Sequence, residues 1–105
     1  MKLPISNLED IKIGDIFCYY NRYSANYAFY KRISVEEADK LAQKEAICKN
    51  WVTNIIKTES GRLPVFGINL KFGNIGWLSH KETPLTKVTP TIQILFMENY
   101  DKISR

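Results

Sequence analysis

The segment IGDIFCYYNRYSANYAFYKRISVEE, residues 13–37, decides the fold of this chain. Its first part, Asp15 to Tyr20, is rich in aromatic and β-branched residues, and so is the part from Tyr27 to Ile33. Residues of these types are enriched in β-strands. The stretch between them, from Asn21 to Asn26, is polar and typical of a loop. The segment therefore predicts a hairpin of two antiparallel strands, with a loop longer than the tight two-residue type.

The same segment ends with the start of a helix. Ser34 can accept a hydrogen bond from the first turn, and Glu37 stands where it can close a capping box. Apolar residues then recur at helical spacing, at Val35, Ala38, Leu41, Ala42 and Ala46. The pattern predicts one helix over about residues 35–48, with Asn50 as its stop.

The segments on either side predict shorter elements. Before the hairpin, Ser6 to Ile11 predicts a single helical turn with Ser6 as its cap. After the helix, strands are predicted at Trp51–Ile56, at Leu63–Leu70 and, beyond a glycine-rich bend, at Gly76–Leu78. The apolar run Thr91–Met97 is consistent with a buried strand or a short helix.

This order of elements predicts an α+β fold in a single domain spanning residues 1–105. The sheet is expected to be mostly antiparallel, because short connections dominate. The preferred architecture is a small curled sheet or SH3-like barrel, with the one helix packed on it or inserted into it. A flatter, grasp-like sheet over one helix is the alternative.

Composition limits the class of protein. The 105 residues are 45% hydrophobic and 25% charged, as in ordinary globular domains. A net charge of +4, carried by scattered lysines, permits nucleic-acid binding without arguing strongly for it. Apolar runs are far too short to span a bilayer, and the first ten residues lack the apolar core of a signal peptide. We therefore expect a cytoplasmic protein with no membrane partner.

No catalytic or metal-binding motif is evident. His80 is the only histidine, and Glu82 is the one carboxylate near it in sequence. Cys18 and Cys48 form no CxxC pattern, and unpaired cysteines are more often small buried hydrophobes than nucleophiles. The glycines fit no phosphate-binding loop. We expect a protein that is not an enzyme and that holds no cofactor and no metal.

The tyrosines of the hairpin are the most unusual feature. Five of them lie between Tyr19 and Tyr30, interleaved with cations. Because strand residues alternate between the two faces, both faces of the hairpin carry rings, and some rings are expected to be exposed. Exposed tyrosines beside cations can stack on bases or anchor a protein interface. The predicted partner-binding residues are Tyr20, Arg22, Tyr23, Tyr27, Lys31 and Arg32.

The hairpin also carries a partial family resemblance. Three parts of residues 13–33 resemble a signature of small uncharacterised phage and mobile-element proteins: Ile13-Gly14-Asp15-Ile16-Phe17, Tyr23 and Asn26-Tyr27-Ala28-Phe29-Tyr30-Lys31-Arg32-Ile33. The later Gly76-Trp77-Leu78 resembles a Gly-Trp segment of the same group. The chain departs from that signature in its loop, where Asn21-Arg22 replaces Trp-Gly, and in the helix that follows directly. The resemblance implies a phage origin and a barrel-like start, and it transfers no active site. An excess of eleven lysines over four arginines fits the A/T-rich genomes of low-GC bacteria and their phages.

Together these observations lead to one main hypothesis about function. The chain is expected to be a non-enzymatic phage or mobile-element protein that binds a host protein or protein–nucleic acid complex, such as a bacterial defence nuclease that it inhibits in the manner of an anti-CRISPR protein. The alternative is a nucleic-acid-binding accessory module that uses the same aromatic and basic hairpin. The alternative requires Arg22, Lys31, Arg32, Lys49, Lys57 and Lys71 to converge on one face. An enzyme would instead require His80, a cysteine and a carboxylate to meet in one pocket.

Overall fold

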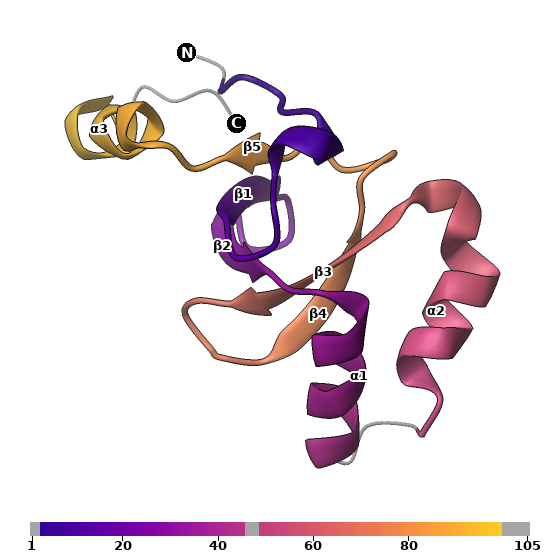
Figure 1. Cartoon of the computed structure of the whole chain (residues 1–105). Helices are drawn as coiled ribbons and strands as arrows, with labels where there is room; N and C mark the ends of the chain where they lie inside the picture. Colours follow the sequence, from indigo (N-terminus) through magenta and orange to yellow (C-terminus); the bar gives the residue numbers. More distant parts are fainter. Residues whose placement is uncertain (1–2, 46–48, 100–105) are drawn as a thin grey trace.

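The centre of the molecule is a sheet of five strands in the order β4-β3-β2-β1-β5, with every neighbouring pair antiparallel (Figure 1). The computed structural model describes residues 3–45 and 49–99. The strands are β1 (Ile16–Asn21), β2 (Asn26–Arg32), β3 (Pro64–Asn69), β4 (Ile75–Ser79) and β5 (Thr86–Lys87). The helices are α1 (Val35–Lys44), α2 (Trp51–Glu59) and α3 (Pro90–Asn99), with short 3₁₀ turns η1 (Leu8–Asp10) and η2 (Ser60–Arg62). The α+β class and the antiparallel sheet are thus confirmed.

The sheet is not closed into a barrel. Its two outer strands are β4 and β5, and each is paired with one neighbour within the described part of the chain. β5 contributes only two residues, Thr86 and Lys87, and they pair with β1 and not with β4. The expected SH3-like barrel is not seen, and the open sheet carries three helices rather than the one helix that was expected.

One face of the sheet is covered by α1 and α2, which lie side by side (Figure 1). The core on this face contains Ile33, Phe66 and Ile75 from the sheet side and Ala38, Ala42, Val52 and Ile55 from the helices. Trp51 packs edge-on against Phe66, with 5.9 Å between ring centroids. Both helices thus contribute buried residues to the core on this face.

The other face of the sheet has a separate core. Ile11 and Leu85 come from segments that precede and follow the strands, and they pack with Phe17 and Val65. All four side chains are at most 2% exposed. Because successive strand residues point to opposite faces, β3 places Val65 in this core and its neighbour Phe66 in the helical one.

The first helix begins as the sequence predicts. The Ser34 side chain accepts a hydrogen bond from the Glu37 N–H at 3.1 Å, and Glu36 and Glu37 lie in the first turn. Both features stabilise the positive end of a helix dipole. α1 ends at Lys44, so the expected continuation to residue 48 is not seen at Glu45, and residues 46–48 lie outside the described part.

The predicted strand at Trp51–Ile56 is wrong, because these residues form the first two turns of α2. Trp, Val, Thr and Ile favour strands in isolation, but that preference is weak and packing overrides it. Val52 and Ile55 are three residues apart and are both buried against the sheet, which is the spacing of one helix face.

The remaining segments differ less from expectation. Thr91–Met97 is helical, within α3, and Gly76–Leu78 lies within β4. The predicted turn near Ser6 is η1, but Ser6 does not cap it, because the Ser6 hydroxyl accepts from the Lys87 N–H at 2.8 Å. No helix among the described residues has the length and apolar character needed to cross a bilayer.

Candidate interaction surface at the end of the hairpin

The β1–β2 hairpin ends in a turn whose shape is fixed by asparagine side chains. Asn21 Oδ1 accepts from the Tyr23 N–H at 2.9 Å, and Asn26 Oδ1 accepts from the Tyr27 N–H at 2.8 Å. Ala25 takes a left-handed φ of 53°. Such side-chain bonds to nearby backbone are the usual way in which asparagine shapes a turn. The turn holds Tyr23 with its side chain fully exposed, at 103% of the reference area.

This hairpin is longer than the strands beside it. The Leu70 N–H donates to the Phe29 carbonyl, which is the last backbone contact between β3 and β2. On the other side, β5 pairs only with Phe17 and Cys18 of β1. The β2 residues 26–28 therefore extend past the sheet by roughly 10 Å at the usual rise per strand residue. The hairpin forms a two-stranded arm that carries Tyr23 at its end.

Aromatic contacts support one face of this arm. Phe96 of α3 packs edge-on against Tyr27 and Phe29, with 5.2 Å between ring centroids in each pair. Tyr20 and Tyr27 are cross-strand partners, with centroids 5.5 Å apart. These rings are half-buried, so their first role is to pack α3 on the arm.

On the opposite face, Tyr30 stacks against both Phe17 and Tyr19, at 5.9 and 6.0 Å between centroids. Burial, followed by the influence of Tyr30, raises the pKa of Tyr19 to about 12. Tyr19 thus stays protonated at any physiological pH and acts as a packed ring rather than as an acid or base.

The six predicted binding residues do not share one surface. Arg22 and Tyr23 are exposed at the tip, and Tyr20 and Tyr27 are half-buried below α3. Lys31 is exposed, but on the face opposite to that of Arg32, since the two are consecutive in β2.

Arg32 is a structural anchor in this arrangement. Its guanidinium donates to the carbonyls of Leu8 and Ile11, at 3.2 Å to Leu8 and closer to Ile11. Burial lowers the pKa of Arg32, and the nearby Asp15 partly opposes this. These bonds tie the segment around η1 to the sheet, so the guanidinium is engaged inside the molecule.

A second turn carries exposed side chains that the sequence analysis did not identify. The β3–β4 turn exposes Phe72 at 73% and Leu70 at 49%, and Lys71 Nζ lies 5.3 Å from the Phe72 ring centroid. The turn is held by Asn69, whose side-chain oxygen accepts from the N–H groups of Lys71 and Phe72. The sequence does indicate this exposed turn, because large apolar residues such as Leu70 and Phe72 are unusual in a turn beside a glycine.

Both turns lie at the same end of the sheet, because β2 begins at the first turn and the antiparallel strand β3 ends at the second. We use the name end surface for five of the exposed residues of the two turns, those with large or charged side chains, which are Arg22, Tyr23, Leu70, Lys71 and Phe72. Three of these five are large apolar or aromatic residues. Tyrosine, arginine and phenylalanine are favoured in the cores of protein interfaces, whereas lysine is depleted there.

The basic residues proposed for a nucleic-acid interface are dispersed. Lys31 and Arg32 lie on opposite faces of β2, and the Arg32 guanidinium is engaged by backbone carbonyls. Lys57 belongs to α2 and Lys71 to the β3–β4 turn. The end surface contains only two of the six proposed cations, Arg22 and Lys71, so it can contact few phosphates.

The possible catalytic residues are separated. Cys18 is fully buried in β1, and burial raises the pKa of its thiol to about 12, so it is not activated. His80 follows β4, three strands away in the sheet, or roughly 14 Å at the usual strand spacing. Cys48 lies outside the described residues. Within residues 3–45 and 49–99, no cluster of three histidine, cysteine or acidic side chains could hold a metal ion.

His80 is half-buried. Its Nδ1 is buried without a hydrogen-bond partner among the described residues. Glu82 is held by Arg62 at 3.3 Å, in a group that also contains Glu59 at 3.2 Å. The carboxylate nearest to His80 in sequence is therefore already engaged by an arginine.

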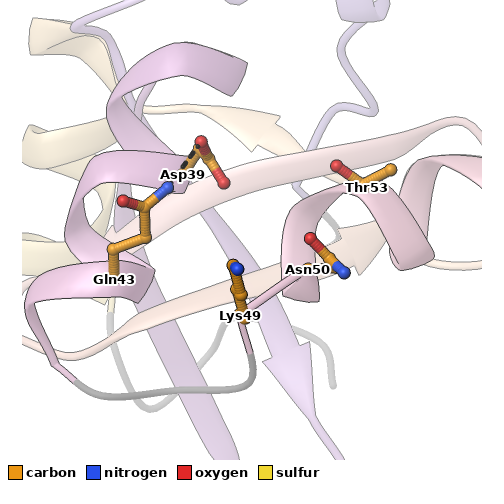
Figure 2. A pocket seen from close by; sticks show the side chains of 5 residues that line it. All are labelled: Asp39, Gln43, Lys49, Asn50 and Thr53. Atoms are coloured by element: carbon orange, nitrogen blue, oxygen red, sulfur yellow. Dashed lines mark hydrogen bonds between the residues drawn. The ribbon is translucent and has the colours of Figure 1, made fainter.

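A hollow of about 410 Å³ lies between the end of α1 and the start of α2 (Figure 2). Its walls are polar and come from Asp39, Gln43, Lys49, Asn50 and Thr53. Gln43 Nε2 donates to Asp39 Oδ2 at 3.1 Å, as the dashed line in Figure 2 shows. Small-molecule sites are usually lined mainly by apolar side chains, and this hollow has none of the predicted binding residues. It does not point to a ligand.

A comparison of the chain with protein-family models, with curated proteins and with solved structures finds no significant match.

Proposed function

We propose that this protein is a non-enzymatic binding protein that holds a partner protein with its end surface. The observation that supports this most is Tyr23, which is fully exposed at the end of the arm, in a turn held by a hydrogen bond to the Asn21 side chain. Covering an exposed ring with a partner is favourable, and tyrosine and arginine are among the residue types that contribute most at interface hot spots. Its neighbour Arg22 is exposed in the same turn.

Contacts within the arm hold its shape before a partner binds, so little conformational entropy is lost on binding. The turn is held by Asn21 and Asn26, and the rings of Tyr27 and Phe96 brace the strands below it. Binding to an ordered loop avoids the entropy that is lost when a flexible loop becomes fixed. This favours a protein target with a defined surface.

A host protein of a bacterium is the partner class that we propose, with the chain originating from a phage or mobile element. The proposal includes a defence nuclease as the specific target, because a small protein that inhibits such an enzyme needs only a binding surface. Nucleic acid is a weaker candidate for the end surface, since two cations would give only a shallow dependence of affinity on salt.

The experiment is affinity capture from a low-GC bacterial lysate, with and without nuclease treatment. It compares the wild type with an Arg22→Ala/Tyr23→Ala variant and with a matched Val35→Ala/Lys40→Ala variant, whose exposed residues lie on α1. Far-UV circular dichroism checks that all three are folded.

We expect one protein that is captured despite nuclease treatment by the wild type and by the α1 variant, and lost with the end-surface variant. Each purified candidate is then tested for direct binding and for inhibition of its activity. Capture that disappears on nuclease treatment would favour nucleic acid instead. Equal capture by all three forms would exclude the end surface as the binding site.

A further inference from the structure

The outer edge of β4 has unpaired backbone groups. The Asn69 N–H donates to the Asn74 carbonyl, and the His80 N–H donates to the Leu63 carbonyl, so these two pairs set the hydrogen-bonding phase of the β3–β4 ladder. Along an antiparallel strand, residues whose backbone groups bond to the neighbouring strand alternate with residues whose backbone groups point away from it. Gly76 and Leu78 therefore bond to β3, and Ile75 and Trp77 point their N–H and C=O groups to the open side. No described residue forms a hydrogen bond with these outward groups.

This edge has none of the usual protection against pairing. Natural edge strands are kept short or carry lysine, proline or a bulge. β5, at the other edge, has two residues, and its Lys87 forms an ion pair with Asp15 at 3.3 Å. β4 has five residues, Ile-Gly-Trp-Leu-Ser, with no charge and no proline, and its pairing with β3 runs without a break from Ile75 to Ser79.

The edge also fits its own copy. With a two-fold axis at Trp77, the outward N–H and C=O of Trp77 meet the same groups of the second copy, and Ile75 stands opposite the second copy's Ser79. The Ser79 carbonyl already accepts from the Thr83 N–H at 2.8 Å, so the new ladder rests mainly on Trp77 and on the Ser79 N–H. Gly76 then stands opposite the second copy's Leu78, so a residue without a side chain faces a large one. A Cβ on Gly76 would meet the Tyr30 side chain at ordinary contact distance, 3.8 Å from Cε1 and 3.9 Å from the hydroxyl oxygen, so a side chain can be added there without a clash.

We infer that β4 pairs with β4 of a second copy of this chain, antiparallel about Trp77, to form a continuous ten-stranded sheet. The absence of charge along β4 lets two basic chains meet there without like charges in contact, although each carries a net charge of +4. The inference is independent of the end surface, which lies on the turns.

Sedimentation velocity over a range of concentrations tests this pairing, together with amide hydrogen exchange. The variant is Gly76→Lys, which adds a charged side chain at the edge while its own backbone bonds to β3 stay in place. The matched control is Gly61→Lys in η2, where a Cβ would meet nothing within 4 Å. We expect the wild type and the control to reach twice the 12.2 kDa chain mass, and Gly76→Lys to remain at the chain mass.

In the wild type, the Ile75 and Trp77 amides are expected to exchange at least about tenfold more slowly at concentrations that give the dimer than at those that give the monomer. This measurement decides the matter even if Gly76→Lys proves to be unfolded by circular dichroism. A wild type that stays monomeric, a dimer that survives Gly76→Lys, or protection of these amides only when a different protein's strand is added would each overturn the inference.

Discussion

The ring of Tyr30 lies against Gly67, across the β2–β3 boundary. A Cβ at Gly67 would stand 3.2 Å from the Tyr30 Cβ, 3.3 Å from its Cδ1 and 3.2 Å from the Lys31 carbonyl oxygen. Two of these three atoms belong to positions that the sheet holds in place, so no flexible side-chain end can move to make room. Gly67 is required here for close approach rather than for an unusual backbone angle.

We therefore expect Gly67→Ala to lower the free energy of unfolding by about 1–3 kcal/mol, as overpacking usually does. Gly61→Ala is the control, because its surroundings are empty. Denaturant unfolding of both variants measures the difference. Equal stability of Gly67→Ala and the wild type would mean that Tyr30 moves freely.

Loss of the Arg32 anchor should be costly. Arg32→Ala removes two hydrogen bonds from a charged donor to the Leu8 and Ile11 carbonyls, and we expect a loss of about 2 kcal/mol in unfolding free energy. Arg22→Ala, at an exposed position, should change stability by less than about 0.5 kcal/mol. Thermal unfolding compares the two, and a similar small effect of both would contradict the anchoring role.

The N-cap of α1 can be tested with two substitutions at Ser34, one that removes the hydrogen-bond acceptor and one that keeps it. Ser34→Ala removes the acceptor for the Glu37 N–H and should cost about 1 kcal/mol. Ser34→Asp keeps an acceptor and should retain most of the stability. If the aspartate variant is as unstable as the alanine variant, the hydroxyl has a role other than capping.

Tyr19 should make stability fall at high pH. Its pKa in the folded chain is about 12, against about 10 for an unfolded tyrosine. The unfolded chain therefore loses this proton first, so the contribution is complete below about pH 10 and declines between pH 10 and 12. Relative to Tyr19→Phe, the wild type should lose stability progressively as the pH rises through that window. Urea unfolding at a series of pH values measures this, and parallel curves for the two proteins would contradict it.

The elements that the sequence predicted correctly are those with local causes. The hairpin from Ile16 to Arg32 follows from two strand-forming runs and a polar loop, and the start of α1 follows from the chemistry of Ser34 and Glu37. Part of α2 was predicted as a strand, because Trp51–Ile56 has strand propensity. Its helical form is favoured by packing on the sheet, as in the contact of Trp51 with Phe66, and the local sequence does not show that packing. The edge strand β5 was not predicted, because its two residues have little strand signal of their own.

The candidate site was predictable only in part for a similar reason. Tyr23 in a polar loop indicated exposure without reference to the rest of the chain. Arg32 looked like a surface cation because its partners, the carbonyls of Leu8 and Ile11, are more than twenty residues away in sequence. Phe72 was passed over because its turn is brought to the same end of the sheet as the first turn only through the antiparallel pairing of β2 and β3.

Val65 and Phe66 are consecutive in β3 and belong to cores on opposite sides of the sheet. A slip of β3 by one residue would exchange them, placing a valine where a phenylalanine ring is needed and a ring where only a valine fits. Each core therefore holds the strand in register for the other, and neither can loosen while its counterpart stays packed. For a chain of this size, such mutual dependence makes unfolding a single event. The core under α1 and α2 and the core around Phe17 should unfold together, at one denaturant concentration and with one rate.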